Sequence, residues 1–233
     1  PKASDLTWET ATTYDLGIDL GFFGNRLNIT ADVYMRDTKN MLCDGMQLPS
    51  VYGAQVPRQN IADMRTRGWE LSVAWQDRLA VAGKLLNYSI SAGVSDYTTK
   101  VTRYNNPSKL LSKYYVGQTL GELWGFSVGG FFVSDEEAAN YPVDQSYLNQ
   151  QIITSVGERG LRAGDVKYLD LDGDNEISIG SNTVDNPGDQ RIIGNTLPRY
   201  AYNFKLGASW NGVDFSAFFQ GIGHQDWYPA GNA

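Results

Sequence analysis

The side chains best suited to chemistry are three aspartates, Asp170, Asp172 and Asp174, which alternate along a short polar segment. Ca²⁺ binds about six to eight oxygen ligands, and carboxylates at alternate positions of a tight loop can converge on one ion. The three aspartates match the first, third and fifth positions of an EF-hand loop. Because like charges held close together repel one another, a bound cation would stabilise this arrangement.

Other residues complete this loop only in part. Glu176 would supply a backbone oxygen, and Asp185 and Asp189 could add carboxylates from further along the chain. Asn175 stands where an EF-hand loop has its turn-forming glycine, and Ser181 stands where it has a bidentate glutamate. The sequence therefore predicts a structural Ca²⁺ site outside an EF-hand fold, with a solvated acidic turn as the alternative.

Aromatic side chains in segments predicted to be loops form a second group of candidates. Trp124, Phe126, Trp227 and Tyr228 could stack on sugars or pack against a partner protein. The alternative is that such rings form the core of an ordered loop domain. We treat these four residues as candidate contacts for a substrate or a partner.

Support for catalysis is weak. His224 is the single histidine and Cys43 the single cysteine, and no nucleophile-elbow motif surrounds either residue. The glycine-rich piece at 125–130 lacks the Lys-Ser/Thr ending of a phosphate-binding loop. The net charge of −7 argues against a nucleic-acid partner, which would require a basic face. We therefore expect a protein that is not an enzyme and does not bind nucleic acid.

The elements that must position these residues are segments in which apolar and polar side chains alternate. Side chains repeat every second residue along a strand, so this alternation gives each strand one apolar and one polar face. The apolar runs extend over about 9–11 residues, the length that a tilted strand needs to cross the hydrocarbon of a membrane. Strands are predicted at 12–23, 26–38, 67–78, 84–101, 198–210 and 213–222.

Aromatic residues lie near both ends of the apolar face in three of these strands, as in the aromatic girdles of outer-membrane barrels. The phase of the third strand predicts that Leu71 and Val73 face lipid, whereas Glu70 and Ser72 face the lumen. The aromatic pairs are Tyr14 and Phe22, Trp69 and Trp75, and Tyr200 and Trp210.

The connections between the predicted strands alternate between short and long. Outer-membrane barrels have short periplasmic turns and long extracellular loops, so this alternation gives the sheet an orientation. Asn211-Gly212 is in addition a strong signal for a two-residue hairpin turn. The short turns are 23–25, 79–83 and 211–212, and the long connections are 39–66 and 102–197.

These patterns predict an all-β chain. Residues 1–233 would form part of an antiparallel up-and-down transmembrane β-barrel, with about six barrel strands against outer-membrane lipid. Residues 102–197 would be a large extracellular insertion with an extra hairpin at 115–133 and a short helix within 135–160. About eight strands are the usual minimum for a membrane barrel, and no signal peptide is visible. We therefore expect the chain to be an internal part of a longer protein.

Several stretches, spread in order over nearly the whole chain, carry a family resemblance. They are DLTWET (5–10), YMRDTKNML (34–42), GWELS (68–72), GQTLGELWG (117–125), GDVKY (164–168), GDQRIIGN (188–195), PRY (198–200) and FFQG (218–221). Together they resemble the carboxy-terminal part of SusC/RagA-type TonB-dependent outer-membrane transporters. The family's short acidic loop corresponds to Asp170, Asp172 and Asp174.

The resemblance implies a barrel of about 22 strands with an amino-terminal plug, located in the cell outer membrane. It implies energy from the TonB system, a SusD-type surface lipoprotein as partner, and import of an oligosaccharide or peptide ligand. This chain would form barrel wall and extracellular loops, and it would not transport without the plug. The resemblance does not name the ligand.

Two other function classes fit parts of the same pattern. A secreted calcium-dependent carbohydrate-binding β-sandwich would use the acidic loop and the aromatic rings. It would bury its apolar faces and stay monomeric in buffer, whereas an open sheet with an apolar face would associate without detergent. A β-rich hydrolase is a third possibility, and it would act on polymeric glycans.

Overall fold

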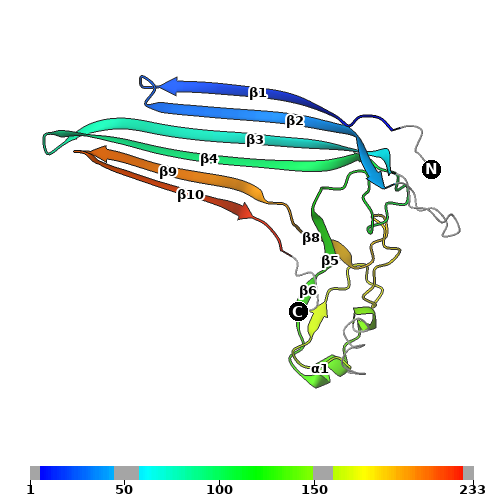
Figure 1. Cartoon of the computed structure of the whole chain (residues 1–233). Helices are drawn as coiled ribbons and strands as arrows, with labels where there is room; N and C mark the ends of the chain where they lie inside the picture. The colour runs from blue at the N-terminus through cyan, green and yellow to red at the C-terminus, as the bar shows by residue number, and fades with distance from the viewer. Residues whose placement is uncertain (1–5, 45–57, 149–159, 228–233) are drawn as a thin grey trace. The chain divides into compact units, whose positions relative to one another are not determined.

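The computed structural model describes residues 6–44, 58–148 and 160–227 (Figure 1). Within these ranges, no helix is long and apolar enough to cross a membrane. The chain divides into two compact units, which we describe separately. The first consists of Pro1–Asn105, Val116–Gly121 and Asn195–Ala233, and the second consists of Asn106–Tyr115 and Glu122–Gly194.

The first unit is built on one antiparallel sheet of six strands in the order β1-β2-β3-β4-β9-β10 (Figure 1). All six predicted strands are present, and the predicted antiparallel all-β class is confirmed. Strand β9 pairs with β4 although the whole second unit lies between them in sequence. The strands are β1 (Thr10–Phe22), β2 (Leu27–Asp44), β3 (Arg58–Val81), β4 (Lys84–Arg103), β9 (Arg199–Trp210) and β10 (Val213–His224).

Tight turns join the neighbouring strands at one end of the sheet. Asn211 and Gly212 have φ of 51° and 82°, the positive values that a type I′ turn requires at both central positions. Ala82 and Gly83 link β3 to β4 with φ of 49° and 74°. The alanine adopts a backbone conformation that favours glycine, and this explains why the sequence indicates that turn less clearly.

At the opposite end, the strands are longer than predicted. Strand β3 has 24 residues, and β2 has 18. Backbone pairing continues past the apolar runs, where charged side chains replace apolar ones. Asp37 accepts two hydrogen bonds from Arg65, and Asp63 accepts two from Arg103. Hydrophobic alternation cannot detect strand ends of this kind.

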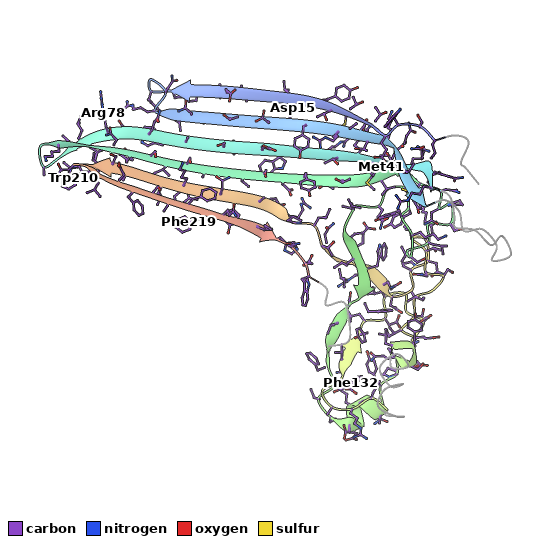
Figure 2. All side chains as sticks on the ribbon, in the orientation of Figure 1. Asp15, Met41, Arg78, Phe132, Trp210 and Phe219 are labelled. Carbon is purple, nitrogen blue, oxygen red and sulfur yellow. The ribbon has the colours of Figure 1, made fainter. Side chains whose placement is uncertain are left out.

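The register confirms the phase of the strands. Leu71 lies opposite Ala31 and Val94, whereas Glu70 lies opposite Asp32. Figure 2 shows side chains projecting from both faces of the sheet. Within the described part of the first unit, no second layer of strands packs on the apolar face, and Leu16 is 74% exposed. A β-sandwich would bury this face.

The second unit has short strands and short helical segments. Strand β5 (Glu122–Phe126) pairs with β8 (Gln190–Asn195), and β6 (Val128–Phe131) pairs with β7 (Val166–Tyr168). The extra hairpin predicted within 115–133 is therefore wrong in its pairing. Only Ser127 separates β5 from β6, which is too little chain for the usual two-residue hairpin turn.

The predicted helix is present as α1 (Asp135–Ala139). The Ser134 hydroxyl caps it by accepting a hydrogen bond of 3.1 Å from the Glu137 backbone N–H. Asp135, Glu136 and Glu137 all fall in its first turn, where carboxylates complement the positive end of the helix. The acidic first turn of the helix therefore agrees with the helix start predicted from these three residues.

Candidate functional site

The acidic loop lies in the second unit and brings three predicted carboxylates together. One carboxylate oxygen from each of Asp170, Asp172 and Asp174 lies within 4.8 Å of the other two. Desolvation, together with the charges of neighbouring aspartates, raises the pKa of Asp172 above its ordinary value. The loop therefore concentrates negative charge at one point, as predicted from the alternation.

Backbone hydrogen bonds hold this loop in shape. The Asp170 carboxylate accepts bonds of 2.6 Å from the Gly173 N–H and 2.9 Å from the Asn175 N–H. Asn175 has a φ of 65°, and asparagine tolerates this left-handed conformation better than most residues. The asparagine thus takes the conformation for which an EF-hand loop uses glycine.

The other proposed ligands are placed differently. Asp189 is fully buried, and its two oxygens accept hydrogen bonds from the Leu171 N–H at 2.6 Å and the Ser178 N–H at 2.8 Å. Asp185 is exposed and forms an ion pair of 3.4 Å with Lys109. The backbone N–H of Glu176 donates to Asp174 at 2.8 Å. Asp189 thus joins the two arms of the loop, whereas Asp185 lies outside the cluster of three.

The predicted aromatic contacts differ in exposure. The Trp124 indole N–H lies 3.1 Å from a Glu122 carboxylate oxygen, and the Phe126 ring meets Tyr168 edge-on at 6.0 Å. Both rings therefore pack within the second unit. Trp227, in the first unit, is 82% exposed. Tyr228 lies outside the described residues.

Tyr115 accompanies Trp124 in the second unit and was not singled out from the sequence. Its ring is buried, and its hydroxyl donates to the Glu122 carboxylate. Burial, with the hydrogen bond to that carboxylate second, raises the pKa of Tyr115 to about 12. No spacing motif indicates this contact, because it depends on how the segment folds back on itself.

The single histidine and cysteine are not brought together in a catalytic arrangement. His224 Nε2 lies 3.0 Å from an Asp226 carboxylate oxygen, and the same oxygen accepts a bond of 2.7 Å from the Asn195 N–H. The Asn195 N–H is also the main cause of a lowered pKa of Asp226. Cys43 is a partly exposed residue of β2. The pair at Asp226 therefore fixes the chain beyond β10.

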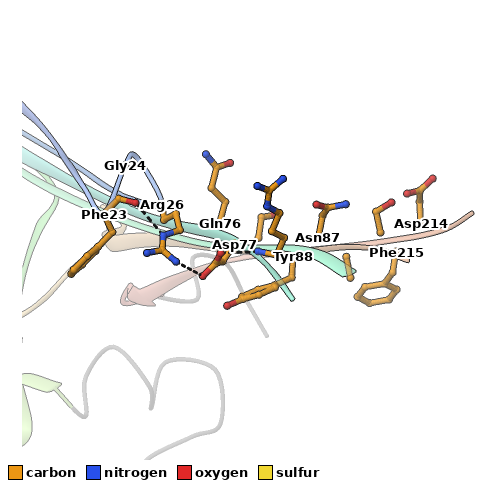
Figure 3. Close-up of a pocket in the computed structure, with 14 residues that line it drawn as sticks. Phe23, Gly24, Arg26, Gln76, Asp77, Asn87, Tyr88, Asp214 and Phe215 are labelled. Atoms are coloured by element: carbon orange, nitrogen blue, oxygen red, sulfur yellow. Dashed lines mark hydrogen bonds and ion pairs between the residues drawn. The ribbon is translucent and has the colours of Figure 1, made fainter. Parts of the chain in front are cut away.

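The turn end of the sheet shows how the two faces differ. In Figure 3, Gln76, Asn87 and Asp214 extend from one side of the strands, and Tyr88 and Phe215 extend from the other. A hollow of about 750 Å³ at this end is lined by residues of both faces. Its lining extends from the β1–β2 turn across β3, β4, β9 and β10, and we assign it no ligand.

A set of charged side chains, which the hydrophobic pattern does not indicate, continues the apolar face beyond its end. Arg65 and Arg67 keep the odd-numbered phase of Trp69 and Leu71 along β3. Arg65 donates bonds of 2.6 and 2.8 Å to Asp37 on β2. The sequence does carry a signal for these residues, because the alternation of side chains between the two faces continues past the last apolar residue of the strand.

Comparison with known proteins identifies similar chains over almost the full length. The family described as TonB dependent receptor-like, beta-barrel matches residues 2–171. TonB-dependent receptor P39 of Formosa agariphila is 27% identical over 238 residues, which cover 92% of this chain and 22% of that protein. TonB-dependent receptor SusC of Bacteroides thetaiotaomicron is 24% identical over 227 residues, which cover 94% and 21%. The chain thus spans about a fifth of the length of these relatives.

Solved structures show the same fold. The RagAB peptide transporter matches with a TM-score of 0.60 and 20% identity, over 93% of this chain and 21% of that one. The RagAB peptide importer in the open-open state matches with a TM-score of 0.61 and 21% identity, over 94% and 21%. At this level of identity the likeness concerns the fold alone.

Proposed function

Because the chain belongs to the TonB-dependent receptor β-barrel family, whose members are outer-membrane proteins, we propose that it forms part of the wall of an outer-membrane importer. Membership confirms the SusC/RagA-type resemblance and the predicted location. Proteins of this family are transport proteins rather than enzymes, in agreement with the sequence-based expectation. The observation that carries the proposal is the antiparallel sheet whose apolar face is exposed.

The proposed wall has its tight turns on the periplasmic side and its long connections outside. Turns at 23–26, 82–83 and 211–212 lie at one end of the sheet, because antiparallel neighbours joined by tight turns must alternate in direction. The second unit, inserted between β4 and β9, then belongs to the extracellular loops.

The imported ligand is proposed to be an oligopeptide or an oligosaccharide. The RagAB neighbours are named as peptide importers, and this supports the first class. The exposed ring of Trp227 could stack on either ligand or pack against a lid. A SusD-type lipoprotein is proposed as that lid, and the TonB system is proposed as the energy source through other parts of the complete protein.

We further propose that the acidic loop binds one structural Ca²⁺. Support comes from the convergence of Asp170, Asp172 and Asp174, which are oxygen donors of the kind that Ca²⁺ prefers. Backbone carbonyls and water would complete the coordination. The ion would order the loop, and no catalytic step is assigned to it.

Uptake by cells that produce the complete protein tests the proposed function. Labelled oligopeptides and oligosaccharides of matched size would be offered in turn, with and without a protonophore that removes the driving force for TonB. We expect uptake of one ligand class, abolished by the protonophore. Uptake unaffected by the protonophore, or equal in cells without the protein, would contradict importer function.

A further inference from the structure

A cluster of basic side chains lies on the apolar face of the sheet, beyond the apolar runs of three neighbouring strands. On that face, Asp37 of β2 lies opposite Arg65 of β3, and Arg65 lies opposite Lys100 of β4. Arg67 is the next residue of β3 on the same face, and Trp69 follows it. The basic cluster consists of Lys39, Arg65, Arg67 and Lys100.

The basic cluster has more cations than ion-paired carboxylates. Asp37 is bonded by Arg65 at 2.6 and 2.8 Å, and Lys39 and Arg67 also lie within electrostatic reach of that carboxylate. Asp63 lies within reach of Lys39 as well, but its carboxylate is paired with Arg103. Lys39, Arg67 and Lys100 are exposed, and their side chains make no ion pair with any residue that the structure describes.

The pairing of Arg65 with Lys100 is unfavourable by itself. Like charges directly opposite each other on one face of an antiparallel pair destabilise it. No described acidic side chain besides that of Asp37 forms an ion pair with the basic cluster. An anion placed over the cluster would relieve this repulsion. Guanidinium groups suit phosphate in particular, because their planar donors form paired hydrogen bonds to its oxygens.

The position of the cluster indicates where that anion comes from. Tyr14, Met35 and Arg67 form one row across β1, β2 and β3, and Trp69 lies one row closer to the apolar centre. Aromatic side chains of outer-membrane barrels mark the boundary of the hydrocarbon. Basic side chains beyond that boundary extend to the lipid headgroups.

We propose that the basic cluster binds the phosphate groups of a phosphorylated glycolipid in the outer leaflet of the membrane. The inference rests on the proposed function, because it uses the lipid-facing and outward orientation of this face. Each cation near an anionic surface strengthens binding by about fivefold. Removal of two unpaired cations should therefore weaken lipid binding by at least about tenfold.

The test compares charge-matched variants of the complete protein. The first, Lys39→Gln with Arg67→Gln, removes two cations of the basic cluster and leaves the pair of Arg65 and Asp37 intact. The control, Arg36→Gln with Lys205→Gln, removes two cations from the opposite face of the same sheet. Each protein is incubated with phosphatidylcholine vesicles that contain either lipid A or dephosphorylated lipid A. Binding is measured as the amount of that lipid that stays with the protein through purification.

We expect the unmodified protein and the control to retain lipid A over its dephosphorylated form, and the cluster variant to lose this preference by about tenfold. Equal retention of both lipids by the unmodified protein would overturn the proposal, as would equal loss in the control. Displacement of lipid A by millimolar inorganic phosphate alone would also overturn it, because the site would then recognise free phosphate rather than a lipid.

A photo-crosslinking lipid separates this proposal from the proposed function. In a cysteine-free version of the complete protein, a diazirine-bearing phospholipid should crosslink to Leu71. It should not crosslink to Ser72, which lies on the opposite face. Labelling at Leu71 without lipid A preference would overturn the glycolipid site alone. Labelling at Ser72 and not at Leu71 would overturn the barrel placement itself, and the glycolipid site with it.

Discussion

The sheet of the first unit and the loops of the second unit are stabilised by different interactions. Strand β3 pairs with β4 from Asp63 to Val81, with one irregularity at its beginning. The sheet is held together mainly by a long ladder of backbone hydrogen bonds. Its side chains mainly determine which face is apolar and which is polar. In the second unit, β7 has three residues and β8 has six, so ladders contribute much less.

Buried polar side chains replace the ladder in the second unit. Gln145 is 2% exposed, donates to the Val166 carbonyl at 3.0 Å and accepts from the Tyr168 N–H at 2.8 Å. Asp189 plays the same part for the acidic loop. The stability of the sheet should therefore depend on which face a substituted residue occupies. The stability of the second unit should depend instead on single buried polar side chains.

The largest expected effect comes from a charge on the apolar face. Val73→Arg should destabilise the complete protein in lipid by about 2–4 kcal/mol, because a cation near the centre of the hydrocarbon is poorly solvated. Ser72→Arg, one residue away on the polar face, should cost far less. Denaturant unfolding in lipid vesicles measures both, and equal costs would contradict the assignment of faces.

A buried carboxylate of the second unit should have the next largest effect. Asp189→Ala leaves the partly buried N–H groups of Leu171 and Ser178 without their acceptors, which should cost about 1–3 kcal/mol in all. Limited proteolysis within 160–194 should accelerate, while the sheet stays intact. Asp185→Ala is the matched control, since its exposed ion pair contributes little. Similar acceleration in both variants would argue against a special role for Asp189.

Removal of the proposed ion should act on the same unit more weakly. An ion present at about ten times its dissociation constant lowers the population of the locally opened loop by about tenfold. Chelation should therefore speed cleavage of the acidic loop by about that factor, and Asp172→Asn should do so without chelator. Addition of Ca²⁺ should restore protection in the unmodified protein only. Unchanged cleavage in all of these conditions would leave the loop as an acidic turn.

The smallest effect is expected in the turn between β3 and β4. Ala82 has a φ of 49°, so Ala82→Gly should stabilise the sheet by about 0.5–1 kcal/mol by removing the Cβ from a left-handed conformation. Gly83→Ala, at a φ of 74°, should have the opposite sign. Unfolding midpoints of the two variants provide the measurement, and a destabilised Ala82→Gly variant would contradict the turn geometry.

The sheet could be predicted from the sequence because its information is local. A two-residue period in side chains such as Leu71 and Val73 fixes both the strand and its faces. The start of β3, which includes Arg65, and the end of β2 beyond residue 38 were underestimated, because pairing there depends on polar and charged cross-strand contacts rather than on hydrophobicity.

The second unit was predicted less well because its contacts are non-local. The pairing of β5 with β8 joins segments that lie far apart in sequence, and nothing in either segment specifies the partner. The three aspartates of the acidic loop were found because they are close in sequence. The buried position of Asp189 and the contact of Tyr115 with Glu122 depend on the folded path of the chain.

The central claim, that one face of the sheet meets lipid and the other meets water, is tested most directly by spin labels along β3. Single labels would be placed in turn at residues 69 to 76 of the complete protein in lipid bilayers, and their accessibility to oxygen and to a water-soluble nickel complex compared. We predict an alternation with a period of two, in which odd-numbered positions favour oxygen and even-numbered positions favour nickel. A uniform profile, or the opposite phase, would contradict the account.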